Sequence, residues 1–189
     1  MDHTSGQGPL IDVFVREVVL SKNSKKLQDL PVLLFLQGGP GFPAARPSSA
    51  SGGWLGEALK EHRVLLLDMR GTGRSTPVTA QTLQSMPAKE QAAYLEHFRA
   101  DSIIHDCEAI RKQLGLEKLS LLGQSFGGFC ILTYLSFFPK SIETAYLTGG
   151  LAPVLESSPD EVYRGTYQRV LTRNRRYYDT YPGDVQKVR

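Results

Sequence analysis

The sequence lacks the features that mark membrane, secreted and metal-binding proteins. No apolar run approaches the ~20 residues of a membrane-spanning helix, and the longest one, Pro31 to Leu36, has the length of a strand. The N-terminal region lacks the basic and then apolar order of a secretion signal. Two cysteines, Cys107 and Cys130, are too few for a disulfide framework or a zinc site, so we expect buried free thiols. These absences predict a cytoplasmic protein with no membrane contact, no metal and no cofactor.

The sequence also has little net charge. The formal charge is +3 and the pI is about 8.9, which does not indicate a nucleic-acid partner. The densest basic cluster, Arg173, Arg175 and Arg176, is typical of one solvated helix face. With 189 residues, of which 41% are apolar, the chain is long enough for a hydrophobic core. Nothing in the sequence indicates an oligomeric state.

Short apolar segments alternate with helical patterns along the chain. A first strand is expected where Ile11, Val13 and Val15 alternate with other residues, buried strands at "PVLLFLQ" and "RVLLLD", and further strands at "KLSLL" and "ETAYLTGG". Helices are expected in "GWLGEALKEH", from about Ala88 to Leu114 with Gly115 as C-cap, and in "FGGFCILTYLSFF". The alternation predicts an α/β fold with a mostly parallel sheet and helices on both faces.

The last part of the chain has a different pattern. After "GGLAPVLESSPDE" one helical pattern, rich in aromatic and basic residues, runs from Glu161 to about Tyr181. Ser158 is the expected N-cap, because Glu161 follows at the spacing of a capping box. No further strand follows this helix, so the segment is typical of the beginning of a helical insertion.

One motif indicates nucleophilic chemistry. Gly123-Gln124-Ser125-Phe126-Gly127 is a G-x-S-x-G pattern that lies between a predicted strand and a predicted apolar helix. In that context the glycines leave room for a strained turn that lifts the serine hydroxyl clear of the sheet. The positive end of the helix that begins near Phe126 would face a developing oxyanion. Ser125 is therefore the candidate nucleophile; the alternative is a serine in a turn that only connects strand to helix.

Two further loops follow predicted strands. An oxyanion hole needs one N–H from the residue after the nucleophile and one from a loop after an earlier strand. Phe126 would give the first and Gly39 of "QGGPG" the second, since Pro40 has no N–H. In "DMRGTGRS" we expect Asp68 and Arg70 to form an internal ion pair that shapes the loop. Alternatively, both loops have only a structural role.

Together these motifs resemble the α/β-hydrolase fold and, more narrowly, the prolyl aminopeptidase (proline iminopeptidase) family of serine peptidases. The resemblance covers about Val32 to Pro153, and it depends on "LQGGPGFPAARP", "GW", "RVLLLDMRGTGRSTP", "HFRADSIIHDCEAIRKQLG", "SLLGQSFGGFC" and "LTGGLAP". It implies that Ser125 releases N-terminal proline from peptides through an acyl-enzyme. It also implies an N-terminal part of the hydrolase core at 1–155 and the beginning of a helical cap at 156–189.

Two positions depart from the common pattern of that family. Gln37 stands where many members have His. The branch with the larger cap has Gln at this position, so this chain resembles that branch. Met69 stands where Gln is usual, and the sequence offers no functional explanation for that change.

A proton acceptor after the serine is missing. In this fold the triad follows the order Ser, then Asp or Glu, then His. The chain has four histidines, and all of them precede Ser125: His3, His62, His97 and His105. None is predicted to lie within hydrogen-bond reach of the hydroxyl. We therefore expect the N-terminal portion of a hydrolase, inactive alone.

Three other functions fit parts of the sequence. An esterase or amidase would share the same core. A dinucleotide-binding oxidoreductase would use Gly39 to Ala44 as a G-x-G-x-x-A motif with Asp68 after the next strand, but the prolines at 40, 43 and 47 obstruct the helix that should open there. A non-catalytic binding protein on a hydrolase scaffold would explain the missing base.

Overall fold

The computed structural model describes residues 2–3, 6, 10–49, 52–150 and 160–187. These residues belong to two compact units, Met1–Leu151 and Ala152–Arg189. The expected division into a hydrolase core at 1–155 and a cap from 156 stays a prediction.

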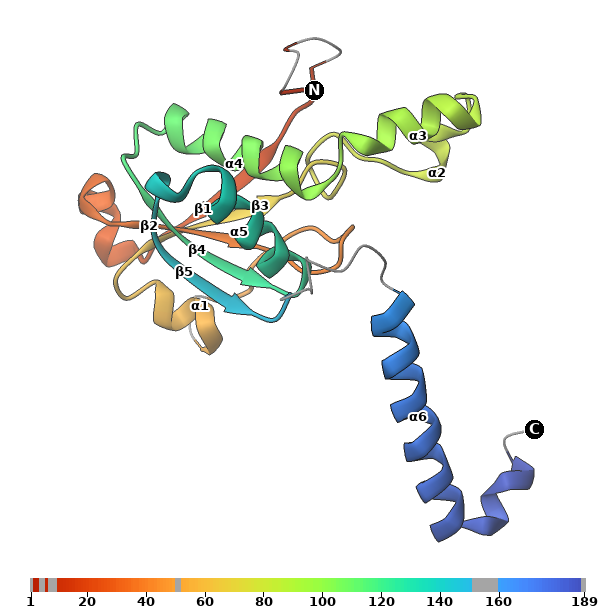
Figure 1. The fold of residues 1–189 in the computed structure, drawn as a ribbon. Coiled ribbons are helices and arrows are strands. Elements are labelled where there is room, and N and C mark those ends of the chain that lie inside the picture. Colours follow the sequence, from red (N-terminus) through yellow and green to blue (C-terminus); the bar gives the residue numbers. More distant parts are fainter. Residues whose placement is uncertain (1, 4–5, 7–9, 50–51, 151–159, 188–189) are drawn as a thin grey trace. The chain divides into compact units, whose positions relative to one another are not determined.

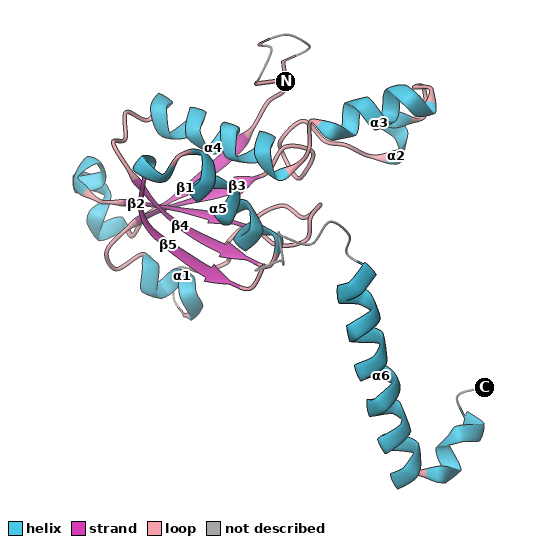
Figure 2. Ribbon diagram, viewed as in Figure 1, coloured by secondary structure: helices cyan, strands magenta, loops and turns pink. Residues whose placement is uncertain are grey.

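The first unit contains one five-stranded sheet (Figures 1 and 2). Its strands lie in the order β1-β3-β2-β4-β5, and all neighbouring pairs are parallel except β1 with β3. The bounds are β1 Phe14–Val18, β2 Val32–Leu36, β3 Arg63–Asp68, β4 Leu119–Gln124 and β5 Ile142–Thr148. The mostly parallel sheet is confirmed, and β1 is its antiparallel edge strand.

Helices cover both faces of this sheet. The α-helices of the unit are α1 Gly53–Ala58, α2 Ala80–Leu83, α3 Ala88–Glu96, α4 Ala100–Gln113 and α5 Phe126–Phe137. Short 3₁₀ segments occupy η1 Ser21–Asp29 and η2 Pro139–Ser141. Figure 1 shows α4 and α5 on one face and α1 on the other.

Two hydrophobic clusters follow from this arrangement. Successive side chains of a strand point to opposite faces, so Leu34 and Leu36 of β2 join the cluster under α4 and α5. Leu33 and Phe35 join the second cluster, against α1. Because both faces are covered, every residue of β2 and of β3 is buried, which explains their continuous apolar sequences.

The predicted helix from Ala88 to Leu114 is two helices. The chain leaves the helical path after α3, where the Phe98 amide donates to the Leu95 carbonyl oxygen, and α4 starts at Ala100. The C-cap of α4 is Leu114, one residue before the predicted Gly115. Gly115 follows it with a φ of 66°, and its amide donates to the Lys112 carbonyl oxygen. The short helix α2 was not predicted, and neither was η1.

Both cysteines are buried free thiols, as predicted. Burial raises the pKa of Cys107, and it raises the pKa of Cys130 to about 12. Across the described ranges, no group of three or more His, Cys, Asp or Glu side chains is arranged to hold a metal ion. None of the described helices is both long enough and apolar enough to span a bilayer.

The second unit contains α6 Asp160–Thr180 followed by η3 Pro182–Lys187. The helix matches the predicted span, Glu161 to about Tyr181, closely at both ends. It buries none of its residues. Ser158, the expected N-cap, lies outside the described residues.

Candidate active site

Ser125 occupies the turn between β4 and α5. Its φ of 52° and ψ of −117° make it the one non-glycine residue with positive φ in the described part of the chain. Hydrogen bonds on both sides hold this conformation. The Ser125 amide donates to the Thr148 carbonyl oxygen at 3.2 Å, and the Ser125 carbonyl oxygen accepts from the Gly128 amide at 2.8 Å. The strained serine is exposed at the end of the sheet where β4 finishes.

The glycines of the motif allow backbone to touch backbone. A Cβ atom on Gly123 would lie 2.5 Å from the Gly127 carbonyl carbon. A Cβ atom on Gly127 would overlap the carbonyl oxygen of Leu36, the last residue of β2. The start of α5 is therefore in direct contact with two strands. This close approach is the physical reason for the spacing of the motif.

A third backbone contact was not predicted from the sequence. A Cβ atom on Gly150 would overlap the Ser125 carbonyl oxygen, and one on Gly128 would overlap the Gly149 carbonyl oxygen. The chain after β5 is thus in close backbone contact with the turn at Ser125. The paired glycines of "LTGG" were the available signal for this contact, but only the structure identifies their neighbours.

The "QGGPG" loop lies against the serine. It follows β2, and a Cβ atom on Gly38 would be 3.1 Å from the Ser125 Cβ. The Gly38 amide donates to the Gln37 side chain at 2.9 Å. The Gly39 amide donates to no acceptor among the described residues. The Phe126 amide belongs to the first residue of α5, where a helix has no internal acceptor for it. Both predicted oxyanion donors are therefore on segments that flank Ser125.

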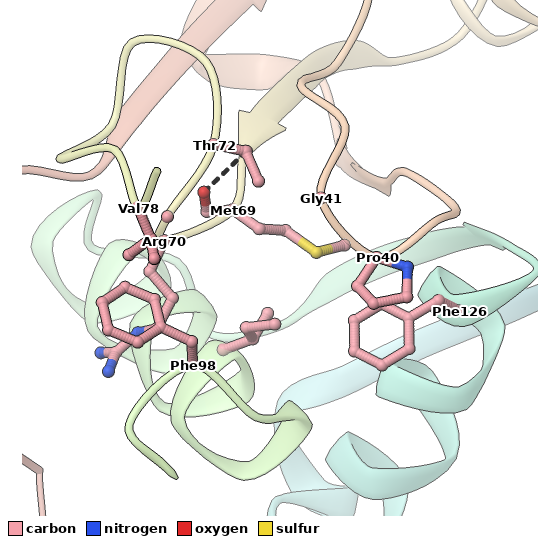
Figure 3. Close-up of a pocket in the computed structure, with 10 residues that line it drawn as sticks. Pro40, Gly41, Met69, Arg70, Thr72, Val78, Phe98 and Phe126 are labelled. Carbon is pink, nitrogen blue, oxygen red and sulfur yellow. Dashed lines mark hydrogen bonds between the residues drawn. The ribbon is translucent and has the colours of Figure 1, made fainter. Parts of the chain in front are cut away.

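An apolar groove adjoins these two segments (Figure 3). It consists of two hollows of about 230 and 460 Å³, and both are lined by Pro40, Phe98 and Phe126. In the smaller hollow, Figure 3 shows Pro40 beside Phe126, with Phe98 across from them and the Met69 side chain extending toward Pro40. Thr72 also lines this hollow, and its hydroxyl donates to the Met69 carbonyl oxygen at 2.8 Å. The groove thus places hydrophobic surface next to both candidate donors.

The expected ion pair between Asp68 and Arg70 is wrong. Arg70 instead forms a buried pair with Asp106 of α4, with Nε at 2.7 Å from Oδ2 and Nη2 at 2.6 Å from Oδ1. The Asp68 carboxylate accepts backbone amides, from Ala44 and from Arg74, each at 2.9 Å. The strand β3 ends at Asp68, and beyond it the chain turns so that Arg70 reaches α4.

Asp106 was missed by the sequence reasoning. It follows Ile103 by three residues and precedes Ile110 by four, so it lies beside the apolar stripe of α4. A carboxylate at such a position is buried and needs a cationic partner. That spacing could have indicated that Asp106 is buried, although it does not identify Arg70 as the partner.

Two of the four histidines lie at the far end of α5 from the serine. The His105 ring stacks on the His3 ring, with centroids 5.4 Å apart, and contacts Phe138 edge-on at 5.2 Å. Phe138 follows α5, whereas Ser125 precedes it, and a helix of 12 residues is ~18 Å long. Burial and the neighbouring His3 lower the pKa of His105.

The other two histidines are also placed without a contact to the serine. His62 directly precedes β3. It therefore lies at the N-terminal ends of the parallel strands, whereas Ser125 follows the C-terminal end of β4. His97 ends α3, and its carbonyl oxygen accepts from Arg70 at 2.7 Å. Among the described residues, no hydrogen bond joins an imidazole to the Ser125 hydroxyl.

The dinucleotide-binding alternative finds no support in the fold. No helix opens in the described residues 38–49, and α1 begins only at Gly53. A phosphate-binding turn needs the N-terminus of a helix directly after the glycines.

Comparisons with known proteins agree with the geometry. Residues 31–188 match the α/β-hydrolase fold family. The chain is 58% identical over 164 residues to a proline iminopeptidase of Aeromonas sobria, a match that covers 86% of this chain and 38% of that protein. It is 43% identical over 169 residues to a proline iminopeptidase of Aspergillus aculeatus, covering 85% and 37% of the two chains.

Solved structures show the same fold. A proline iminopeptidase-related protein from Thermus thermophilus is 28% identical, with a TM-score of 0.50 over 72% of this chain and 40% of that one. A marine microorganism esterase is 20% identical, with a TM-score of 0.50 over 73% of this chain and 41% of that one. This chain spans less than half the length of each of these relatives. The order of the sheet, the turn at Ser125 and the match over residues 31–188 together show that the chain belongs to the α/β-hydrolase fold family.

Proposed function

We propose that this chain carries the nucleophile and the oxyanion hole of a serine hydrolase that releases N-terminal proline from peptides. The observation that supports it most is the exposed Ser125, held at positive φ with Gly38 of the "QGGPG" loop against it. Its hydroxyl oxygen would attack the carbonyl carbon of the N-terminal proline, and the Gly39 and Phe126 amides would bind the resulting oxyanion. As this intermediate collapses, the C–N bond breaks and the rest of the peptide leaves as an amine with the proton taken from Ser125. Water then hydrolyses the proline ester, giving free proline and returning a proton to Ser125.

The substrate assignment rests on the relatives named proline iminopeptidase, one of them 58% identical. The apolar groove is compatible with this assignment, because it offers hydrophobic surface beside Pro40 and Phe126 to a bound peptide. In this proposal residues 1–155 are the N-terminal part of the hydrolase core, and residues 156–189 begin a helical cap.

The proposed reaction needs a base for the Ser125 proton. Two of the imidazoles lie beyond the far end of α5, and none of the four hydrogen-bonds to the serine within the described residues. We place the base, and the acid that orients it, in polypeptide outside these 189 residues. The share of the Aeromonas sobria protein that this chain matches, 38%, leaves room for both. The 189-residue chain alone should therefore turn over little substrate.

A chimera tests this function. The segment of the Aeromonas sobria protein that this chain matches is replaced by this chain, and hydrolysis of proline 2-naphthylamide is measured. We expect turnover that Ser125→Ala lowers by at least about 10³-fold, because the nucleophile is lost. Ser136→Ala is the matched control, since Ser136 is an exposed serine of α5 whose hydroxyl only donates to the Leu132 carbonyl oxygen.

Two results would contradict the proposal. A folded chimera, judged by circular dichroism, that cleaves acyl esters but not proline naphthylamide would assign an esterase instead. Turnover of proline naphthylamide by the isolated 189-residue chain, abolished by Ser125→Ala, would place the base inside the chain.

A further inference from the structure

Asp68 is a buried carboxylate at the end of β3, next to the loop that carries Gly39. Only 3% of the Asp68 surface is exposed to solvent. The strands β2 and β3 are parallel neighbours, with Phe35 opposite Leu66, so Asp68 lies where the "QGGPG" loop leaves the sheet. A carboxylate in such a place needs hydrogen-bond donors for both oxygens.

Backbone amides from two loops supply those donors. Asp68 Oδ1 accepts from the Ala44 amide, and Oδ2 accepts from the Arg74 amide, each at 2.9 Å. The Asp68 carbonyl oxygen accepts from the Ser75 hydroxyl at 2.5 Å. The same Ser75 oxygen accepts from the Phe14 amide of β1 at 2.8 Å. One residue thus ties together the loop after β2, the loop after β3 and the first strand.

The two loops also touch each other at this carboxylate. Gly73 has a φ of 57°, and a Cβ atom on it would overlap Asp68 Oδ2 and lie 2.7 Å from the Pro43 Cβ. Only a residue without a side chain lets the loop after β3 close over the carboxylate and against Pro43. Gly73, the second glycine of "GTG", therefore allows contact with the loop after β2.

We propose that Asp68 is a positioning residue for the oxyanion hole. The loop from Gln37 to Ala44 is held at one end by Gly38 against Ser125 and at the other end by Ala44 on Asp68. Gly39, the donor in the proposed function, lies between these two points. Fixing both ends keeps its amide aimed at the reacting oxygen before substrate arrives, and donors placed in advance are what an oxyanion hole requires. The inference rests on the proposed function for the role of Gly39.

Asp68→Asn separates this role from burial alone. An amide side chain has one acceptor oxygen and presents N–H groups on the other side, so it cannot accept from both Ala44 and Arg74. Glu108→Gln is the matched control, because Glu108 is a carboxylate with 5% exposure whose partners Arg111, Lys112 and Tyr134 all lie outside the oxyanion loop.

The first measurement is amide hydrogen exchange on the 189-residue chain. Asp68→Asn should speed exchange roughly tenfold in peptides that cover 38–44 and 72–76, since a hydrogen bond to a charged group is lost there. Glu108→Gln should speed exchange in α4 and leave 38–44 unchanged. Equal exchange of 38–44 in the wild-type and Asp68→Asn chains would overturn the proposal.

The second measurement is kinetic, in the chimera with the Aeromonas sobria protein. Asp68→Asn should lower kcat for proline naphthylamide by at least about tenfold, with KM within twofold, because a misplaced donor weakens binding of the transition state more than that of the substrate. Glu108→Gln should leave kcat within twofold. Faster exchange of the loop with an unchanged kcat would make Asp68 a purely structural residue and overturn its role. If the chimera is inactive without any substitution, the proposed function has failed, and exchange alone decides whether Asp68 holds the loop.

Discussion

Different kinds of interaction stabilise each of the two compact units of this chain. In the first, β2 and β3 are buried along their whole length and strands meet helices at backbone contact distance. In the second, α6 extends over 21 residues and buries none of them. A substitution in the first unit is therefore governed by packing, whereas one in α6 is governed by helix propensity and local pairs.

The local contacts of the second unit illustrate this difference. Arg164 pairs with Glu161 one turn earlier in α6, and Lys187 pairs with Asp184 in η3. The Tyr177 hydroxyl donates to Asp184 at 2.7 Å. All these groups are close in sequence and lie at the surface, where solvent screens such pairs and leaves them weak. No comparable local pair could replace the long-range contacts of the first unit.

The largest effect is expected from Gly127→Ala. The added methyl group would overlap the Leu36 carbonyl oxygen and lie 2.6 Å from the Leu36 carbonyl carbon, so one of the two backbone segments would have to shift. We expect the free energy of unfolding to fall by more than about 4 kcal/mol, a size reserved for severe core defects. Urea unfolding followed by fluorescence reports on this unit, since the single tryptophan, Trp54, stacks on Phe35 of β2 at 4.5 Å.

Tolerance of Gly127→Ala would contradict the distinction between the two units. An unchanged Trp54 unfolding midpoint would mean that the turn relaxes away from β2, and that close backbone contact does not hold the first unit together.

The next effect concerns the acid stability of the first unit. Arg111 hydrogen-bonds to the buried Glu108 and lowers its pKa from 4.5 to about 2, and the Tyr134 hydroxyl donates to the same carboxylate. A lowered pKa in the folded state stabilises the fold above about pH 4.5, and this contribution is lost as the pH falls toward 2. Glu108→Gln should cost up to about 3 kcal/mol at pH 7, and stability should then vary less between pH 4.5 and 2. Unfolding in urea at several pH values measures both.

Asp184 of the second unit is the control for that experiment. Lys187 and Tyr177 lower its pKa, but the group is exposed to solvent and belongs to local pairs. Asp184→Asn should leave the Trp54 unfolding midpoint unchanged at every pH. An acid response in Asp184→Asn as large as that in Glu108→Gln would contradict the distinction between the units.

Patterns that depend on local sequence could be predicted. The continuous apolar runs of β2 and β3 indicated strands buried on both faces, and the fold class followed from their alternation with helices. The G-x-S-x-G pattern located the turn of Ser125, because the motif lies between an apolar strand pattern and an apolar helix pattern that adjoin it in the sequence. The α6 helix was predicted because its periodicity and propensity are local properties.

Features that depend on distant partners could not be predicted. The partner of Arg70 is Asp106, 36 residues away, and nothing near Arg70 in the sequence favours it over Asp68. Likewise the donors to Asp68 are backbone amides, one of them 24 residues away, and backbone amides leave no compositional signal. The break at Phe98 between α3 and α4 interrupts a helical pattern without a proline or glycine, so periodicity alone joined the two helices.

The smallest effect is expected from Gly165→Ala, which makes the same glycine-to-alanine change in α6. A Cβ atom on Gly165 would meet no heavy atom within 4 Å, so the methyl group enters open space. Glycine inside a helix costs about 0.5–1 kcal/mol relative to alanine, because its backbone loses more freedom on folding. Gly165→Ala should therefore raise the far-ultraviolet helical signal and leave the Trp54 unfolding midpoint where it is. A loss of helicity, or a shift of that midpoint, would show that Gly165 has a close neighbour and that packing governs the second unit as well.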